Sequence, residues 1–324
     1  MDIRIQYRTA QEWGAQEPEN DRFQVNPWTI YGQFGGLTFG YLDSRFDFYD
    51  NANVYGTDPG TIGDQLQIPL VSYTSEFKNG WSVTASLEDA NERNSGVSPV
   101  DVESSAKYIT KSKNPDIVVA IGTSGNWGRF QLSGALHHVG VSSSMAMQGS
   151  SSPRTHGYGS FWGGAAQVGI MFNLPQIAAG DTLYLQSAYV EGAVSYLGMI
   201  NASGLFSPPD AFLSPDGKIS RVTGWNTTIQ YLHNFNAHWN AAIFGGYASF
   251  ELNNRIAEET IGASGGFNYN MGGNIVWQPN SAFNISVQYE YNIYGARNYK
   301  YTGYGLPVRQ QGASQLLVMT QVLF

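Results

Sequence analysis

Residues 283–293 alternate strictly between apolar and polar side chains over their whole length. A period of two places successive side chains on opposite faces of a strand, so the pattern predicts a β-strand with one apolar and one polar face. Strands of a soluble sandwich run for about 5–6 residues, whereas a strand that crosses a bilayer at a tilt needs about 9–11. The length of this segment therefore indicates a strand of a membrane barrel.

The same pattern recurs in units of two strands, with a short turn inside each unit and a long polar connection after it. The predicted strands are residues 2–8, 27–34, 37–42, 69–77, 81–88, 116–123, 127–139, 164–174, 181–191, 220–233, 239–252, 266–277, 283–293 and 314–324. Alternation of short turns with long loops is typical of outer-membrane barrels. Aromatic residues lie near strand ends, as the belts at the two membrane surfaces require: Trp28, Trp81, Trp127, Trp239, Trp277 and Phe324.

Only a closed barrel pairs all the backbone groups of a sheet in lipid. The predicted fold class is therefore all-β, a transmembrane antiparallel β-barrel that forms one domain over residues 1–324. Composition agrees, because charged residues make up only 13% of the chain, about half of the usual share of about 25%.

Several other classes of protein are excluded by composition. The net charge is −8 and no basic stripe is present, which argues against a nucleic-acid partner. There are no cysteines, so disulfides and thiolate metal sites are excluded. No run of about 18 apolar residues exists, so a transmembrane helix is not expected.

A long irregular connection, about residues 44–68, follows the predicted strand at 37–42. Connections of this length are usually functional or disordered. Order is favoured here because Phe46, Phe48, Tyr49 and Tyr55 provide apolar surface to bury. We therefore predict that this constriction loop folds inward, into the space that the strands enclose.

Two motifs resemble the general porins of Gram-negative outer membranes, most closely the alphaproteobacterial porin family. GLTFGYLDSRFDFYD at residues 36–50 is similar to that family's fifth strand and its inward-folded third loop. LLVMTQVLF at residues 316–324 is similar to the outer-membrane assembly signal, which ends here on Phe324. The resemblance implies a trimeric barrel of sixteen strands in the outer membrane, with the third loop inside the pore.

The family also implies a function and partners. The pore would be a water-filled passive channel for ions and small hydrophilic solutes, without a cofactor. Its partners would be outer-membrane lipid, lipopolysaccharide and two further copies of the chain. We expect an apolar seam at residues Trp28, Ile30, Phe34, Leu37 and Phe39 to form the contact between subunits.

The sequence departs from the family in two respects. The family commonly has an arginine at the position of Tyr41, so one constriction charge is not expected here. Alignment of the third-loop motif makes residues 2–8 resemble the family's third strand, and about fourteen strands are visible. We therefore expect that the signal peptide and the first two strands are missing from this sequence.

In the family, a basic cluster on the wall faces acidic residues of the third loop across the constriction. The matching basic residues here are Arg4, Arg8 and Arg45, and the matching acidic residues are Asp47, Asp50, Asp58 and Asp64. The alternative is that Arg8 lies at the outer strand end and that the last two aspartates are turn or helix-cap residues. Because the acidic residues are in excess, we predict a mild preference for cations.

Other charged residues have the parity of the pore-facing side and are expected to line the wide wall: Glu76, Glu88, Arg129 and Glu290. An enzyme is not expected, because no serine lies in a recognisable motif and no HExxH-like metal motif is present. The histidines are assigned to loops and aromatic belts: His137, His138, His156, His233 and His238. Two alternatives stay open, namely a channel selective for sugars or small organic acids and a soluble β-sandwich adhesin.

Overall fold

The computed structural model describes residues 2–10, 24–49, 62–63, 65–100, 112–140, 160–199, 208–214, 218–300 and 309–322, with only the backbone for 2–10, 24–28 and 321–322. Fourteen strands form one antiparallel sheet in which each strand pairs with its neighbours in the chain order. They are β1 (Asp2–Ala10), β2 (Gln24–Phe34), β3 (Leu37–Asp43), β4 (Gln67–Glu76), β5 (Trp81–Glu88), β7 (Asp116–Gly125), β8 (Gly128–Val139), β9 (Phe161–Asn173), β10 (Thr182–Glu191), β13 (Thr223–Asn234), β14 (Trp239–Glu251), β15 (Gly265–Asn280), β16 (Phe283–Arg297) and β17 (Gln310–Val322).

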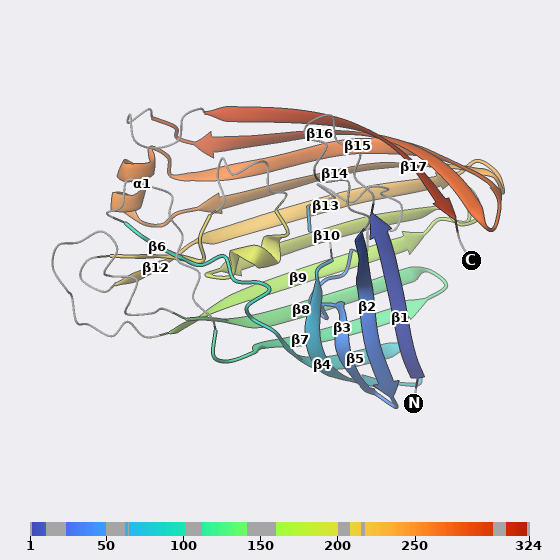
Figure 1. Ribbon diagram of the computed structural model, residues 1–324, viewed down its shortest axis with the longest axis horizontal. Helices are drawn as coiled ribbons and strands as arrows, with labels where there is room; N and C mark the ends of the chain where they lie inside the picture. The colour runs from blue at the N-terminus through green and yellow to red at the C-terminus, as the bar shows by residue number, and fades with distance from the viewer. Residues whose placement is uncertain are drawn as a thin grey trace.

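The sheet curves around an interior and forms the wall of a β-barrel (Figure 1). β7 to β10 and β13 to β16 run roughly along the long axis, whereas β1 to β4 run steeply to it in this view. In the part of the chain that the structure describes, β1 and β17 are the two edges of the sheet. The predicted all-β barrel and all fourteen predicted strands are confirmed.

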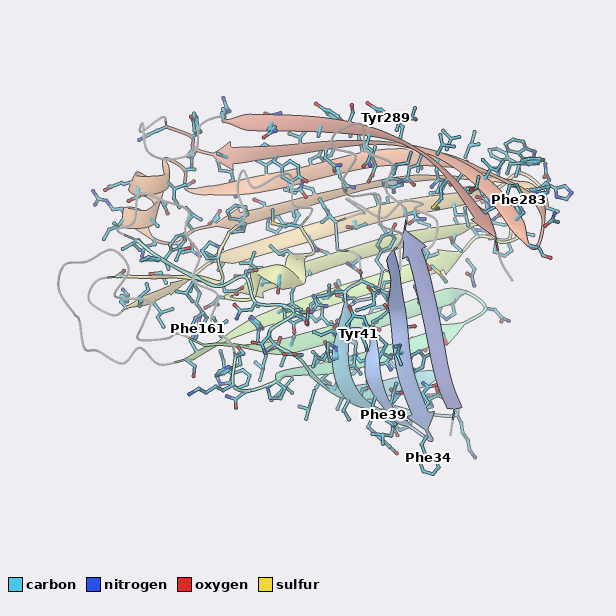
Figure 2. All side chains as sticks on the ribbon, viewed as in Figure 1. Phe34, Phe39, Tyr41, Phe161, Phe283 and Tyr289 are labelled. Carbon is cyan, nitrogen blue, oxygen red and sulfur yellow. The ribbon has the colours of Figure 1, made fainter. Side chains whose placement is uncertain are left out.

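The alternating residues 283–293 form a strand with one apolar and one polar face, as predicted. In β16 the side chains of Val287 and Tyr289 are 44% and 53% exposed on the outer face, whereas Ser286 and Gln288 are buried on the inner face. Figure 2 shows Tyr289 pointing away from the interior. The outer face is therefore apolar and the inner face polar, as lipid outside and water inside require.

Short turns join the strands of each pair, and long connections lie at the opposite end of the wall (Figure 1). The long connections contain structure that the sequence did not indicate. A small sheet has the order β12-β11-β6, formed by β6 (Val97–Pro99), β11 (Ala211–Leu213) and β12 (Ile219–Arg221). Two short helices accompany it, namely η2 (Val194–Leu197) and α1 (Arg255–Ile261).

α1, at the same end of the wall, is capped at both of its termini. The side chain of Asn254 accepts hydrogen bonds from the N–H groups of Ile256 and Ala257, and Gly262 ends the helix in the left-handed conformation. No helix in the described ranges is both long and apolar enough to cross a membrane.

Buried apolar side chains fill part of the interior next to the long connections. The cluster joins the wall, η2 and the constriction loop, and includes Phe46, Val118, Val190, Tyr196, Leu197, Phe212 and Phe250. The rings of Phe46 and Tyr196 meet edge to face with their centroids 4.7 Å apart. The constriction loop is thus packed against the inner wall on an apolar base.

Candidate functional site

The constriction loop leaves β3 and crosses the interior to the inner faces of β8 and β9. Its first anchor is the carbonyl oxygen of Phe46, which accepts hydrogen bonds from Gln131 Nε2 at 3.1 Å, Ser133 Oγ at 2.6 Å and Gln167 Nε2 at 2.7 Å. These side chains have the inward parity of their strands. Polar groups of the wall therefore hold the loop backbone where a strand partner is absent.

The next anchor is aromatic and reaches β10 and β13. The N–H of Tyr49 donates to Gln186 Oε1 at 2.7 Å, and its hydroxyl donates to Gln230 Oε1. The guanidinium of Arg129 lies 4.7 Å from the ring centroid of Phe48 and donates to the carbonyl oxygen of that residue at 3.2 Å. The loop is thus fixed to the wall opposite β3.

The returning part of the loop is anchored at Gly63. Its N–H donates to the carbonyl oxygen of Gly198 at 3.0 Å, and its own carbonyl accepts from Gln186 Nε2 at 3.0 Å. Gly63 has φ +77°, a backbone conformation that favours glycine, and a Cβ there would lie 2.4 Å from Gln186 Nε2 and displace that side chain. Ile62 is buried beside it, with its carbonyl held by Thr228. The predicted inward fold of the constriction loop is confirmed for its described residues, 44–49, 62–63 and 65–66.

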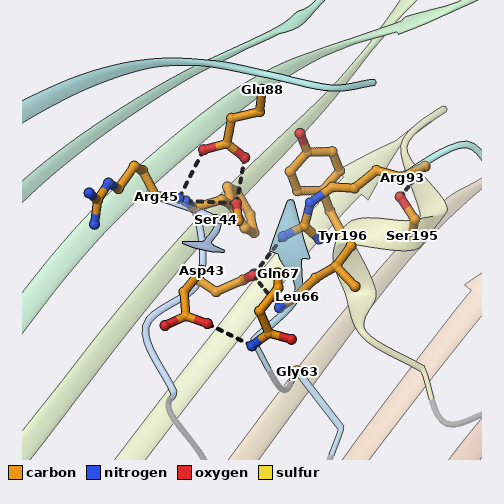
Figure 3. A network of polar contacts seen from close by, with 12 residues as sticks. Asp43, Ser44, Arg45, Gly63, Leu66, Gln67, Glu88, Arg93, Ser195 and Tyr196 are labelled. Atoms are coloured by element: carbon orange, nitrogen blue, oxygen red, sulfur yellow. Dashed lines mark hydrogen bonds and ion pairs between the residues drawn. The ribbon is translucent and has the colours of Figure 1, made fainter. Parts of the chain in front are cut away.

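A buried ion pair fixes the loop close to its two ends (Figure 3). Arg93 Nη2 lies 2.6 Å from Asp47 Oδ2, and both side chains are almost fully buried. The same carboxylate oxygen accepts the N–H of Leu66 at 3.0 Å. Burial raises the pKa of Asp47 to about 6, although Arg93 and the Leu66 N–H both oppose that rise.

Glu88 fixes the start of the loop from β5. Its two carboxylate oxygens accept from Ser44 Oγ at 2.6 Å and from the N–H of Arg45 at 2.8 Å (Figure 3). The side chain of Arg45 turns to the wall, where Nε donates to Ser72 Oγ at 3.1 Å. Burial lowers the pKa of Arg45, and Glu88 and Asp43 oppose this shift. Arg45 stays partly exposed, so its charge faces the interior.

The structure places Asp47 differently from the sequence-based expectation. Its carboxylate is buried and paired with Arg93, so it is not a charge that faces the pore. Asp50, Asp58 and Asp64 lie outside the described residues. Arg4 and Arg8 lie in β1, of which only the backbone is described. The constriction role of these five residues stays a prediction.

The residues expected to line the wide wall have different environments. Glu88 and Glu290 are buried on the inner face, where Glu88 holds the loop, and Glu76 is exposed. Arg129 contacts the constriction loop rather than open water alone. Tyr41 lies on the outer face of β3, so this position does not face the pore (Figure 2).

The apolar seam lies on the outer face of β2 and β3. Phe34 is 69% exposed, and Ile30, Leu37 and Phe39 are also exposed on this face (Figure 2). The side chain of Trp28 and all of Phe324 lie outside the described part.

In the part of the chain that is described, no group of three or more His, Cys, Asp or Glu side chains could hold a metal ion. His233 is bonded to Asp181 near a short turn, and His238 to a backbone carbonyl in the next turn. His137 was not expected to be a fully buried residue, yet its side chain has no exposed surface. His156 lies outside the described ranges.

The sequence pattern did not indicate Arg93 as a functional residue. It lies in a polar connection without periodicity, and its partner Asp47 is 46 positions away. Because Arg93 is not part of an alternating strand pattern, the sequence does not indicate which way its side chain points. Only the three-dimensional path of the loop brings the two charges together.

A β-barrel wall with a loop folded across its interior and an apolar outer face defines an outer-membrane porin. A family model described as a porin subfamily matches residues 1–316. The chain belongs to this porin subfamily, and it is therefore an outer-membrane diffusion channel.

Solved structures share the fold. The outer membrane channel DcaP of Acinetobacter baumannii aligns with 98% of this chain and 79% of its own, at 13% identity and a TM-score of 0.67. Salmonella typhi OmpF, in a complex with daunomycin, aligns with 97% of this chain and 83% of its own, at 10% identity and a TM-score of 0.51. No curated protein shows significant sequence similarity to the chain.

Proposed function

We propose that this chain forms a passive, water-filled channel for ions and small hydrophilic solutes, with no catalytic step. The observation that supports this is the constriction loop, which crosses the interior and is held to inner-wall side chains of β5, β8, β9, β10 and β13. A fixed loop inside a barrel narrows the passage but does not move to close it. Solute size and charge then decide the rate of passage.

Mild cation preference is the selectivity that we propose. Asp47 and Arg93 neutralise each other, so neither supplies a net charge to the pore. Two described cations that contact or belong to the constriction loop are partly exposed, namely Arg45 and Arg129. The preference therefore depends on the remaining loop aspartates: Asp50, Asp58 and Asp64.

A homotrimer in contact with lipid and lipopolysaccharide is the proposed assembly. The exposed side chains of Ile30, Phe34, Leu37 and Phe39 form a continuous apolar surface over two adjacent strands. Packing against a second copy is one way to cover it, and the trimeric assembly expected from the family uses this region. Analytical ultracentrifugation in mild detergent tests it, because a monomer alone would contradict the proposal.

Two measurements test the channel itself. In planar bilayers the purified protein should give steps of conductance that grow linearly with salt concentration. In liposomes, swelling rates with neutral sugars should fall steadily with sugar size and show no saturation. Saturable uptake of one sugar or small organic acid would instead favour the selective channel, and no conductance at all would refute the proposal.

A further inference from the structure

The side chain of His137 lies between two buried carboxylates, near the end of β8 that faces the long connections. Its Nδ1 is 2.7 Å from Oδ2 of Asp116 on β7, and its Nε2 is 3.7 Å from Oδ2 of Asp210, which precedes β11. A neutral imidazole carries one N–H and can donate to only one carboxylate. The imidazolium carries an N–H on both nitrogens and is the form that attracts both.

Asp116 binds this histidine to the wall and to η2. Its Oδ2 also accepts the hydroxyl of Tyr196 at 2.7 Å, and its Oδ1 accepts the N–H of His138 at 3.0 Å. Burial raises the pKa of Tyr196 well above its usual value, so this hydroxyl keeps its proton and donates. Asp116 is thus held by three donors when Nδ1 of His137 carries a proton.

Asp210 belongs to the long connections instead. Its Oδ1 accepts the N–H of Val194, and its Oδ2 accepts the N–H of Ser95, each at 2.8 Å. Asp210 therefore ties together η2, the segment before β6 and the segment before β11. His137 links the carboxylate of Asp210 to β8 of the barrel wall, and the backbone carbonyl of Asp210 accepts the N–H of Val222, next to β13, at 3.0 Å.

The balance of charge around His137 favours the protonated ring. The charged and titratable groups that face it from the elements packed around it, directly or one contact further away, are Asp116, Asp210, Tyr196, His138, Arg93, Asp47 and Glu88. Arg93 is already paired with Asp47. Among these residues the carboxylates outnumber the guanidinium, and a buried carboxylate without a counter-charge is costly.

We propose that His137 is a proton-dependent clamp, which as imidazolium holds Asp116 of the wall and Asp210 of the long connections at the same time. Loss of its proton removes the attraction to Asp210 and loosens the connections at this end of the pore. The effect extends toward the constriction, because Arg93 lies 4.3 Å over the ring of Tyr196 and holds Asp47. The clamp is engaged at lower pH and released as the pH rises.

The protonation state is tested on the folded protein with ¹⁵N-labelled histidine. At neutral pH in detergent micelles, one imidazole should carry protons on both nitrogens, and its signal should be absent from His137→Gln. An unperturbed histidine is mostly neutral at about pH 7.5. A singly protonated His137 at that pH would overturn the proposal, whatever the channel does.

The consequence for the pore rests on the proposed channel function and is tested by current noise between about pH 6 and about pH 10. The wild type should become noisier as the pH rises. His137→Gln should show the noisy state already at neutral pH, with loss of the pH dependence. Asp210→Asn keeps an oxygen that can accept the N–H of Val194, and it should also lose the pH dependence of the noise. The test therefore does not depend on one variant.

His138→Gln is the matched control, because His138 follows on the same strand and its ring meets Trp162 edge to face with centroids 4.9 Å apart. It should keep the pH response of the wild type. Equal pH responses in the wild type and His137→Gln would overturn the clamp even if the ring is doubly protonated. A protein that conducts no ions at neutral pH would refute the channel function, while the ¹⁵N result would still decide the protonation state.

Discussion

Arg93 Nη2 lies 2.6 Å from Asp47 Oδ2, although one residue belongs to the connection after β5 and the other to the loop after β3. This pair joins two long connections inside the barrel, where neither charge contacts bulk water. Tyr196 packs its ring against the guanidinium from a third connection. The position of the constriction loop is therefore set jointly by segments that are far apart in the sequence.

The two members of this ion pair should respond differently to neutralisation. Asp47→Asn keeps the neutral state that the raised pKa of Asp47 favours in the folded protein, so we expect it to keep or raise the free energy of unfolding at neutral pH. Arg93→Gln removes the cation that opposes this rise and leaves a buried carboxyl, so a loss of about 1–2 kcal/mol is expected. Urea unfolding in detergent, monitored by tryptophan fluorescence, measures both.

The double variant Asp47→Asn/Arg93→Gln is the decisive comparison. Two amides can hydrogen-bond without burying a charge, so the double variant should recover most of the stability lost in Arg93→Gln. Effects that simply add in the double variant would show that the two side chains do not interact.

The stability of the protein should also depend on pH through Asp47. Burial raises the pKa of this carboxyl from its usual 3.8 to about 6, so the folded state binds the proton more strongly than the unfolded state. Its contribution to stability is therefore full below pH 3.8 and is lost as the pH rises through about 6. The size is on the order of 3 kcal/mol.

The double variant serves as the control for this titration, because it retains the shape of the pair but has no ionisable group there. Its free energy of unfolding should vary less between about pH 4 and about pH 7 than that of the wild type. Parallel pH curves for the two proteins would contradict a raised pKa at Asp47.

The barrel wall could be predicted from the sequence because its information is local. A strand such as β16 shows its inner and outer faces by parity alone, and β5 (Trp81–Glu88) has the bounds that alternation indicates. The inward fold of the constriction loop was also predictable, since Phe46 and Phe48 needed a surface to bury against.

The details of the site could not be predicted in the same way. Asp47 has the same appearance in the sequence as a pore-lining aspartate, and only Arg93 distinguishes it. His137 has the parity of an inward residue but gives no sign that Asp210 will approach from a loop. The short strands β6, β11 and β12 pair across connections without alternation, so no pattern marks them.

Ion selectivity should respond to the partly exposed arginines and not to the buried pair. Arg45→Gln and Arg129→Gln remove positive charge beside the constriction, so each should raise the cation-to-anion permeability ratio, by roughly twofold at low salt. The double variant Asp47→Asn/Arg93→Gln changes no net charge and should leave the ratio unchanged. Reversal potentials under a KCl gradient measure all three.

Removal of the loop aspartates should shift the ratio in the other direction, and the effect should fade near molar salt, where screening acts over about 3 Å. The variant changes three residues to Asn together: Asp50, Asp58 and Asp64. Anion preference in the unmutated channel, or no response to this triple change, would refute the proposed source of selectivity.

Gly169 on β9 should tolerate no side chain, because Phe48 of the constriction loop lies directly on it. A Cβ at this position would lie 2.2 Å from two ring carbons of Phe48, so the ring must move away from the wall. Gly169→Ala is therefore expected to cost about 1–3 kcal/mol, as overpacking does, and to change the single-channel conductance by displacing the loop.

Gly164 on the same strand provides the matched control for this substitution. A Cβ there would have its nearest neighbour, the carbonyl oxygen of Ala135, at 3.8 Å, which is an ordinary contact. Alanine at such a site usually stabilises a strand, because it restricts the unfolded chain, so Gly164→Ala should leave the conductance unchanged and the stability equal or slightly higher. If Gly169→Ala behaves like Gly164→Ala in both measurements, Phe48 does not rest against β9 and the inward anchoring of the loop at this point is wrong.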